Sequence, residues 1–394
     1  MTMLCEDHAR LAGELVAEAH ANDGLAPVDC ERFWHDNAMA CADPFGRDIP
    51  QCAMGSMCTS ECVFTELGVP ADWHRYYHDP AWVAELVERY NDRAEIIVGR
   101  RACWCPDPTA TSLPVKTLAD IFEARNVFQH ESFWLMPSAS DSDGLRALLD
   151  RVEARLEDLA SFVLPPDWDR LRRDHLAQGR PLPRYRHQRG PVTFATSIFG
   201  SEELIFLCYD EPDLAARLRD TILAAMLGLH RVLEEAAGDD GHGGGRRGFS
   251  FADDNCYLLT PELYEFFALP ILRGMFAACA PDPADWRYQH SDSDMAHLLP
   301  LLASLDFSQV NFGPTVSVRD IRRHMPRTII QGQLAPFTYS RNQEQAMVEE
   351  LLRDHDGVGD SRGLLFTTAG SINDGSRLTG MRLIMAAIQR YGRF

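Results

Sequence analysis

Two short polar segments carry the residue types that acid–base or metal chemistry requires. One is Asp253-Asp254-Asn255 and the other is His290-Ser291-Asp292. Because side chains alternate along a strand, His290 and Asp292 share one face and reach a common ligand. An imidazole and a carboxylate can act as an acid and a base, or as two ligands of a metal ion. The alternative is a structural histidine that only hydrogen-bonds to Asp292 or to another neighbour.

The adjacent aspartates cannot both point inward. A regular strand directs only one of Asp253 and Asp254 to the interior, and the other then caps the following turn. More polar residues stand where other strands are predicted to end, although buried parallel strands are usually apolar. From these positions we predict the catalytic residues His290, Asp254, Asp253 and Asp292, and the substrate-binding residues Asn255, Asn311, Gln333 and Ser371.

The elements that must position these residues are short strand-like runs, most of them followed by a helical pattern. Such alternation is typical of βα units and a parallel sheet. Eight runs close a (β/α)8 TIM barrel, with the active site at the carboxyl ends of its strands. The predicted strands are Ile49–Gly55, Val127–Met136, Val192–Ile198, Gly248–Asn255, Trp286–Asp292, Gln309–Pro314, Thr328–Pro336 and Leu364–Ser371.

Residues 1–48 are predicted to be an N-terminal helical extension, and residues 49–394 the α/β barrel. The extension has helical patterns over 11–20 and 28–39. Within the barrel, apolar spacing of three and four residues predicts a helix over 213–237.

The segment Thr260-Pro261-Glu262 has the pattern of a helix start, with an N-cap, a proline at the first helical position and an acid in the first turn. Gly238–Gly248 has no apolar anchor, so a flexible surface loop is predicted there.

Composition restricts the partners. A formal net charge of -20 disfavours nucleic acid, because nucleic-acid binders usually present a basic stripe. Met1–Arg10 lacks the apolar stretch of a secretory signal, and no window is long and apolar enough for a membrane span. The 11 cysteines, an odd number, do not indicate a disulfide framework. A cytoplasmic protein with reduced thiols, in contact with neither nucleic acid nor membrane, is therefore expected.

Eight cysteines lie in the first 105 residues, and six of them fall between residues 41 and 105: Cys41, Cys52, Cys58, Cys62, Cys103 and Cys105. None forms a CxxC pair matched by a second pair, as zinc ribbons require. This cluster is a weak metal signal, and small buried apolar residues are the simpler interpretation.

Several motifs occur together in the second half of the chain. They are Gly190-Pro191-Val192-Thr193 with Tyr209-Asp210-Glu211-Pro212, Phe251–Asn255 with Leu259–Tyr264 and Pro270, His290-Ser291-Asp292, Asn311-Phe312-Gly313-Pro314 and Gly370-Ser371. This set resembles the uroporphyrinogen decarboxylase superfamily, which also contains cobamide-dependent methyltransferases. The resemblance covers about residues 49–394 and implies a barrel whose central cleft takes an organic acid or a thiol without a nucleotide cofactor. It also suggests, by analogy, a homodimer.

The resemblance does not choose between the branches. In the methyltransferases an HxC motif and a later cysteine bind zinc, which activates a substrate thiol. Here His290 is kept, Asp292 replaces the first cysteine and Ser371 stands at the position of the second. The resemblance therefore still allows a metal site in which His290 and Asp292 bind zinc.

The decarboxylases of the haem pathway carry an arginine-rich RQAGR-like motif near the first strand and a histidine in a final GHG. In this chain residues 52–62 replace the first motif, Arg47 is the only arginine nearby, and Ser371 replaces the histidine. The haem-pathway activity itself is therefore not expected. The same resemblance places Glu61 and Cys62 beside the cleft, as a base, a metal ligand or, if its pKa is lowered, a reactive thiolate.

Three functions follow as hypotheses. The first is a decarboxylase-like lyase for a carboxylate-bearing small molecule that needs no cofactor. The second is a zinc-dependent methyltransferase that acts on a thiol and takes its methyl group from a corrinoid protein or another methylated compound. The third is a non-catalytic barrel used for binding, which the many polar strand ends disfavour.

Overall fold

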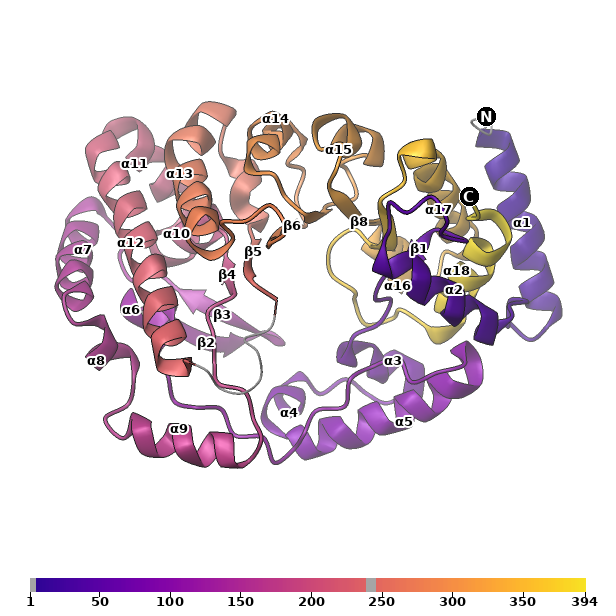
Figure 1. Ribbon diagram of the computed structural model, residues 1–394, viewed down its shortest axis with the longest axis horizontal. Coiled ribbons are helices and arrows are strands. Elements are labelled where there is room, and N and C mark those ends of the chain that lie inside the picture. Colours follow the sequence, from indigo (N-terminus) through magenta and orange to yellow (C-terminus); the bar gives the residue numbers. More distant parts are fainter. Residues whose placement is uncertain (1–4, 239–245) are drawn as a thin grey trace. The chain divides into compact units, whose positions relative to one another are not determined.

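Two compact units make up the chain, and the computed structural model describes residues 5–238 and 246–394 (Figure 1). Of the described residues, the first unit contains 5–110, 292–296 and 309–394, and the second contains 111–238, 246–291 and 297–308. The N-terminal part of the chain therefore packs in one unit with its C-terminal part.

Four parallel strands form the sheet of the first unit. They follow the order β1, β9, β8, β7, so each neighbour pair runs in the same direction. Apolar side chains on these strands, such as Val310, Phe312, Ile330 and Phe366, are fully buried. The strands are β1 (Ala53–Met54), β7 (Gln309–Phe312), β8 (Ile329–Leu334) and β9 (Leu364–Thr368).

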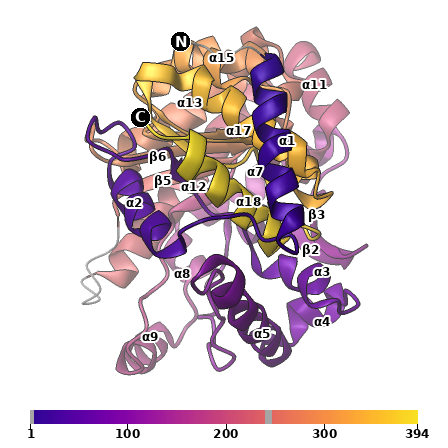
Figure 2. The ribbon, with the colours of Figure 1, turned by 90° about the vertical axis from the view of Figure 1, so that its right-hand side faces the viewer.

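Helices surround this sheet. The helix α5 begins where the Asp79 carboxylate accepts a hydrogen bond from the Trp82 amide, with Pro80 at its first position. Helix α1 packs on α17 and α18, as Figure 2 shows, and α18 packs on α5. The helices are α1 (Cys5–Ala21), α2 (Cys30–Ala42), η1 (Ser60–Cys62), α3 (Val63–Leu67), α4 (Trp73–His78), α5 (Pro80–Val98), α15 (Val318–His324), α16 (Pro336–Ser340), α17 (Glu344–Val358), η5 (Gly359–Ser361) and α18 (Leu378–Tyr391).

The second unit has three parallel strands and a separate hairpin. Strand β5 lies between β4 and β6, and its Phe249 and Phe251 are fully buried. The strands are β4 (His187–Arg189), β5 (Gly248–Ala252) and β6 (Trp286–Ser291), and the hairpin consists of β2 (Arg125–Gln129) and β3 (Ser132–Met136).

The long helix α12 packs against α13 and α7 through an apolar stripe that includes Leu218, Ile222, Ala225 and Leu229. The helices of this unit, with the η3 turn that enters it, are α6 (Leu118–Ile121), α7 (Ser142–Leu156), α8 (Leu159–Val163), α9 (Trp168–Ala177), α10 (Pro191–Phe199), α11 (Ser201–Asp210), α12 (Pro212–Ala237), η2 (Asp254–Leu258), α13 (Pro261–Cys279), η3 (Ala296–Leu298), α14 (Leu299–Leu302) and η4 (Ala303–Leu305).

The predicted α/β class, with parallel strands and N-terminal helices, is confirmed. The helices predicted within 1–48 are α1 and α2, and the helix predicted over 213–237 is α12. Thr260 caps α13 as expected, because its hydroxyl accepts a hydrogen bond from the Leu263 amide at 3.3 Å. Of the loop predicted over 238–248, residues 239–245 lie outside the described residues.

Two of the eight predicted strands are wrong. The run over 127–136 is not a barrel strand, because His130 and Glu131 adopt positive φ and turn it into the antiparallel hairpin of β2 and β3. The run over 192–198 is helix α10, which Pro191 begins. A short apolar run does not distinguish a buried strand from a buried helix. Seven parallel strands are found in the described residues, and closure into a barrel stays a prediction.

Across the described residues, no single helix has the length and apolar character of a membrane span. Within the same residues, α10 and α11 taken together are long and apolar enough for a membrane span, by length and composition alone. The chain bends by 101° between these two helices.

A buried acid in α17 makes the stability of the fold depend on pH. The Asp354 carboxylate is 3% exposed, and burial raises its pKa from 3.8 to about 6, although Arg353 Nε donates a hydrogen bond to Oδ1 at 2.9 Å. The folded state therefore binds the Asp354 proton more tightly than the unfolded state does. The stability that protonated Asp354 contributes is complete below about pH 4 and is lost as the pH rises through about 6.

We predict that Asp354→Asn removes this pH dependence. Between about pH 4 and about pH 7, the free energy of unfolding of the wild type should fall by about 2 kcal/mol relative to that of the variant. Urea unfolding at several pH values measures the difference. The matched control is Asp169→Asn on exposed α9, and an equal pH dependence in both variants would contradict the prediction.

Candidate functional site

The polar segment after β5 is attached to the first turn of α10. Asp253 is completely buried, and its Oδ1 accepts a hydrogen bond from the Thr193 amide at 2.8 Å. Burial raises the pKa of Asp253 to about 6, although hydrogen bonds from Thr193 and Val192 oppose the increase. Among the described residues Oδ2 has no hydrogen-bond partner. Asp253 is therefore the aspartate that points inward, and it holds the start of α10.

Asn255 and Gly190 complete this attachment. The Asn255 amide donates to Thr193 Oγ1 at 3.0 Å, and its Nδ2 donates to Thr196 Oγ1 at 2.7 Å. A Cβ at Gly190 would lie only 2.1 Å from the Asp253 Cβ, so this close approach requires glycine. Two motifs that lie about 60 residues apart, at Gly190–Thr193 and Asp253–Asn255, thus contact each other directly.

Asp254, the first residue of η2, points away from this buried junction. Its side chain is 45% exposed, and its Oδ1 lies 3.9 Å from His290 Nε2 at the end of β6. Strand register accounts for the meeting, because Ala252 lies beside His290 in the sheet and Asp254 follows two residues later. The predicted catalytic residues Asp254 and His290 therefore lie close enough for an ion pair when the imidazole is protonated.

A second histidine, which the sequence analysis did not single out, belongs to the same sheet. His187 on β4 shares a hydrogen bond of 2.8 Å between its Nδ1 and Ser250 Oγ. Its pKa is lowered, first because the surrounding protein excludes water from the ring and second because His290 lies near. His187 was missed because β4 has no apolar residue. The sequence signal near β4 is Gly190-Pro191, which begins a helix and so indicates that a strand ends just before it.

Asp292 and Ser371 meet in the first unit. The Ser371 hydroxyl donates a hydrogen bond to Asp292 Oδ2 at 3.2 Å, and both side chains are exposed. A Cβ on Gly370, which has a φ of +108°, would lie 2.2 Å from Asp292 Oδ1. The two positions at which the resemblance expects zinc-binding cysteines are thus neighbours here, as an aspartate and a serine.

Asn311 and Gln333 use their amides to hold loops. Asn311 Nδ2 donates to the carbonyl oxygens of Gln331 and Thr368, and its Oδ1 accepts from the Gly370 amide. Gln333 Nε2 donates to the carbonyl oxygens of Gly313 and Val316 at 3.1 and 2.6 Å. Both residues are buried, so they support the loops that follow β7 and β9. Their contact with a substrate stays a prediction.

Glu61 and Cys62 lie in η1, after β1. Burial and the nearby Asp374 raise the pKa of Glu61. Burial also raises the pKa of Cys62 to about 11, so at neutral pH its thiol is protonated. The low pKa that a reactive thiolate needs at this position is therefore not found.

One group of side chains has the donors that a metal ion needs. In the second unit Asp254 and His290 each offer one ligand atom, and these atoms lie 3.9 Å apart. An imidazole nitrogen and a carboxylate oxygen suit a divalent cation such as zinc. Asp292, two residues after His290 in the chain, stays a ligand predicted from the sequence. Asp254 is the ligand that the sequence did not predict.

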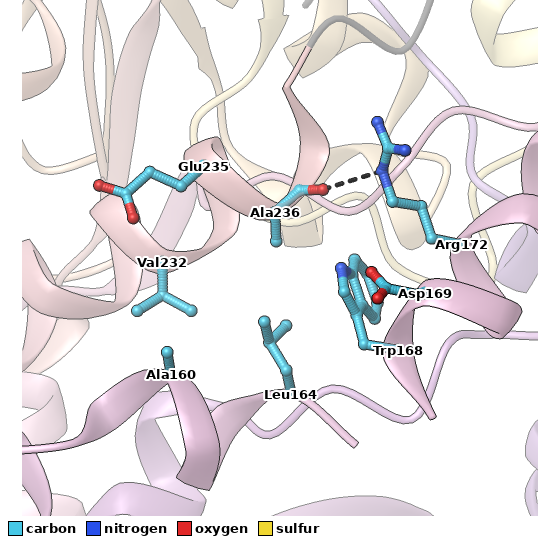
Figure 3. A pocket seen from close by; sticks show the side chains of 8 residues that line it. All are labelled: Ala160, Leu164, Trp168, Asp169, Arg172, Val232, Glu235 and Ala236. Carbon is cyan, nitrogen blue, oxygen red and sulfur yellow. Dashed lines mark hydrogen bonds between the residues drawn. The ribbon is translucent and has the colours of Figure 1, made fainter. Parts of the chain in front are cut away.

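A pocket of about 390 Å³ in the second unit contains none of the predicted site residues. In Figure 3 the Arg172 guanidinium lies at one side of it and donates its Nε hydrogen to the Ala236 carbonyl oxygen at 3.1 Å. Arg172 Nη2 also donates to the Ala237 carbonyl oxygen, so the guanidinium is hydrogen-bonded to backbone carbonyl groups at the carboxyl end of α12. The pocket is lined by Ala160, Leu164, Trp168, Asp169, Arg172, Val232, Glu235 and Ala236.

Comparison with known proteins gives a family and a fold. Residues 187–391, slightly more than half of the chain, match the uroporphyrinogen decarboxylase (URO-D) family. A methyltransferase from Methanosarcina mazei has a similar structure, with a TM-score of 0.54 and 16% sequence identity over 90% of this chain and 98% of that chain. At such low identity the likeness concerns the fold alone. No curated protein matches the sequence.

We predict that Gly190→Ala destabilises the protein, because the added methyl group must displace Asp253 from the start of α10. The expected loss in the free energy of unfolding is about 2 to 3 kcal/mol, as for an overpacked interior site. Urea unfolding measures it. Gly13→Ala in α1 is the control, since nothing lies within 4 Å of the new Cβ and alanine favours a helix. Equal stability of the two variants would contradict the predicted contact.

Proposed function

Because the chain belongs to the uroporphyrinogen decarboxylase family, a family of enzymes, we propose that it is a decarboxylase-like lyase acting on a carboxylate-bearing small molecule. The observation that carries the proposal is the pair of His290 and Asp254, whose Nε2 and Oδ1 lie 3.9 Å apart. An imidazole beside a carboxylate at strand ends is suited to proton transfer.

Decarboxylation sets two tasks for the protein. The bond between the substrate carbon and its carboxylate breaks, carbon dioxide leaves, and the electron pair that stays on the carbon must be stabilised and then protonated. In this proposal protonated His290 gives its proton to that carbon. Asp254 stabilises the imidazolium before the transfer and any positive charge that develops on the substrate.

The two aspartates have different roles in this mechanism. Asp253 is completely buried and its Oδ1 is bound to the Thr193 amide, so we assign it a positioning role. Asp254 is partly exposed and faces His290, so it is the one that acts on the substrate. Asn255, Asn311 and Gln333 likewise use polar atoms to position backbone and neighbouring side chains.

We predict that His290→Asn lowers kcat for carbon dioxide release by about a hundredfold or more, because the proton donor is lost. A panel of small carboxylic acids is assayed for carbon dioxide release and, in heavy water, for deuterium on the product carbon. The control is His324→Asn at the end of α15, which should keep wild-type activity. A panel that releases no carbon dioxide with the wild type would refute the lyase proposal.

A zinc-dependent methyltransferase is the second candidate, and the pair of His290 and Asp254, with Asp292 two residues after His290 in the chain, favours it. Bound zinc would lower the pKa of a substrate thiol and make it a nucleophile for a methyl group. The methyl donor in this proposal is a corrinoid protein or another methylated compound. The oxygen-rich ligand set differs from the thiolates that usually accompany thiol activation, which is why this function ranks second.

Metal content separates the two candidates without a known substrate. The methyltransferase proposal predicts about one zinc ion per chain, lost on His290→Ala and kept in His324→Ala. Elemental analysis after zinc reconstitution and dialysis measures it. A wild type that binds no metal would eliminate this candidate and leave the acid–base mechanism. Absence of both metal and turnover, with an unchanged metabolite profile in a His290→Ala strain, would favour a binding role.

A further inference from the structure

Two cysteines that are distant in the sequence meet in the first unit. Cys58 lies after β1 and Cys103 lies after α5, and their Sγ atoms are 3.3 Å apart. Both thiols are free, and the Cys103 thiol donates a hydrogen bond to Cys58. At this distance the sulfurs are in contact, and a disulfide requires them to approach to about 2.05 Å.

The backbone around Cys103 is held by a single buried side chain. Asn91 of α5 is completely buried, and its Oδ1 accepts hydrogen bonds from the amides of Ala102 and Cys103, each at 2.9 Å. Asn91 Nδ2 donates to the Cys103 carbonyl oxygen at 2.8 Å. Three hydrogen bonds thus orient the segment that presents Cys103.

The backbone around Cys58 is held as well. The Tyr339 hydroxyl donates to the Met57 carbonyl oxygen at 2.9 Å, and the Ser56 hydroxyl donates to the Cys58 carbonyl oxygen at 3.0 Å. Tyr339 is 1% exposed, so this anchor lies in the core. The contact between the sulfurs is therefore built into the fold and is not an accident of two exposed side chains.

The surroundings distinguish Cys58 from the other buried thiols. The hydrogen bond from Cys103 and the positive charge of Arg100 lower the pKa of Cys58. Burial raises the pKa of Cys52 to about 12 and that of Cys62 to about 11. Because the thiolate is the nucleophile, Cys58 is the thiol of these three whose pKa is best suited to reaction with an oxidant.

A metal site does not account for the pair. Zinc held by thiolates needs further ligands close to both sulfurs. Among the residues that the structure describes, the only group of three or more potential ligands within 4.8 Å contains neither Cys58 nor Cys103. The pair is therefore better described as two thiols in contact than as part of a metal site.

We propose that Cys58 and Cys103 form a redox-active dithiol that hydrogen peroxide converts to an intramolecular disulfide and that external thiols reduce again. The Cys58 thiolate attacks one peroxide oxygen, the O–O bond breaks, and the released hydroxide takes a proton to become water. The Cys103 sulfur then displaces hydroxide from the Cys58 sulfenic acid, and the Cys103 proton converts that hydroxide to water. Two thiols are oxidised, one peroxide is reduced and two water molecules leave.

A small oxidant suits the site. Cys58 is 7% exposed and Cys103 is partly exposed, so peroxide reaches the pair more easily than a bulky disulfide does. The bond would join the segment after β1 to the segment after α5. Because η1 begins two residues after Cys58, the disulfide would restrict the short helix that carries Glu61 and Cys62.

The test uses the full chain. The reduced protein is treated with hydrogen peroxide, its remaining thiols are alkylated, and peptides from a non-reducing digest are identified by mass spectrometry. The expected product is a peptide pair joined through Cys58 and Cys103, with loss of about two titratable thiols per chain that dithiothreitol restores. This readout on the wild type requires neither a variant nor catalytic activity.

Two variants define the pairing. In Cys103→Ser the cross-link should disappear, and Cys58 should accumulate as a sulfenic acid that dimedone labels. Cys105→Ser, two residues away, should keep the cross-link. Joining of Cys58 to Cys62 in the wild type, oxidation of other thiols while this pair stays reduced, or a zinc ion that is lost in Cys103→Ser would each overturn the proposal.

Discussion

A buried carboxylate at the start of a helix holds the candidate site of the second unit together. The Asp253 carboxylate is completely removed from water, which disfavours its charged form. The hydrogen bond from the Thr193 amide at the amino end of α10 compensates for part of this desolvation cost. The aspartate is possible only because Gly190 leaves room for it. Since Asp254 follows Asp253 directly, the buried contact decides where the partly exposed Asp254 carboxylate lies relative to His290.

The same histidine serves both candidate chemistries. With Asp254 it offers an acid–base pair in one proposal and two ligands for a divalent cation in the other. A carboxylate at Asp292, where the resemblance expects a thiolate, shifts the metal preference toward harder cations and weakens the case for thiol activation. In the first unit Ser371 donates to Asp292 and Asn311 secures the loop of Gly370, so the exposed aspartate is oriented by neighbours that need no metal.

Two thiols are in contact where the resemblance does not expect cysteine ligands. The positions at which it expects zinc-binding cysteines hold Asp292 and Ser371, whereas Cys58 and Cys103 are in direct contact elsewhere in the first unit. Asn91 orients the backbone beside Cys103 through three hydrogen bonds. The position of this cysteine is therefore fixed by the fold. The contact makes the cysteine-rich N-terminal part of the chain a candidate for redox chemistry and not for structural zinc.

The sequence by itself determined the α/β class, the capped helix at Thr260, and the polar residues that end β5 and β6, because period, caps and polar interruptions of apolar strands are local signals. It misplaced the strand at β4, since His187–Arg189 has no apolar residue while the run after Pro191 suits a strand or a helix equally. Only the tertiary structure decided which aspartate is buried and which thiols meet, because burial and contacts between residues distant in sequence arise from packing and leave no local pattern.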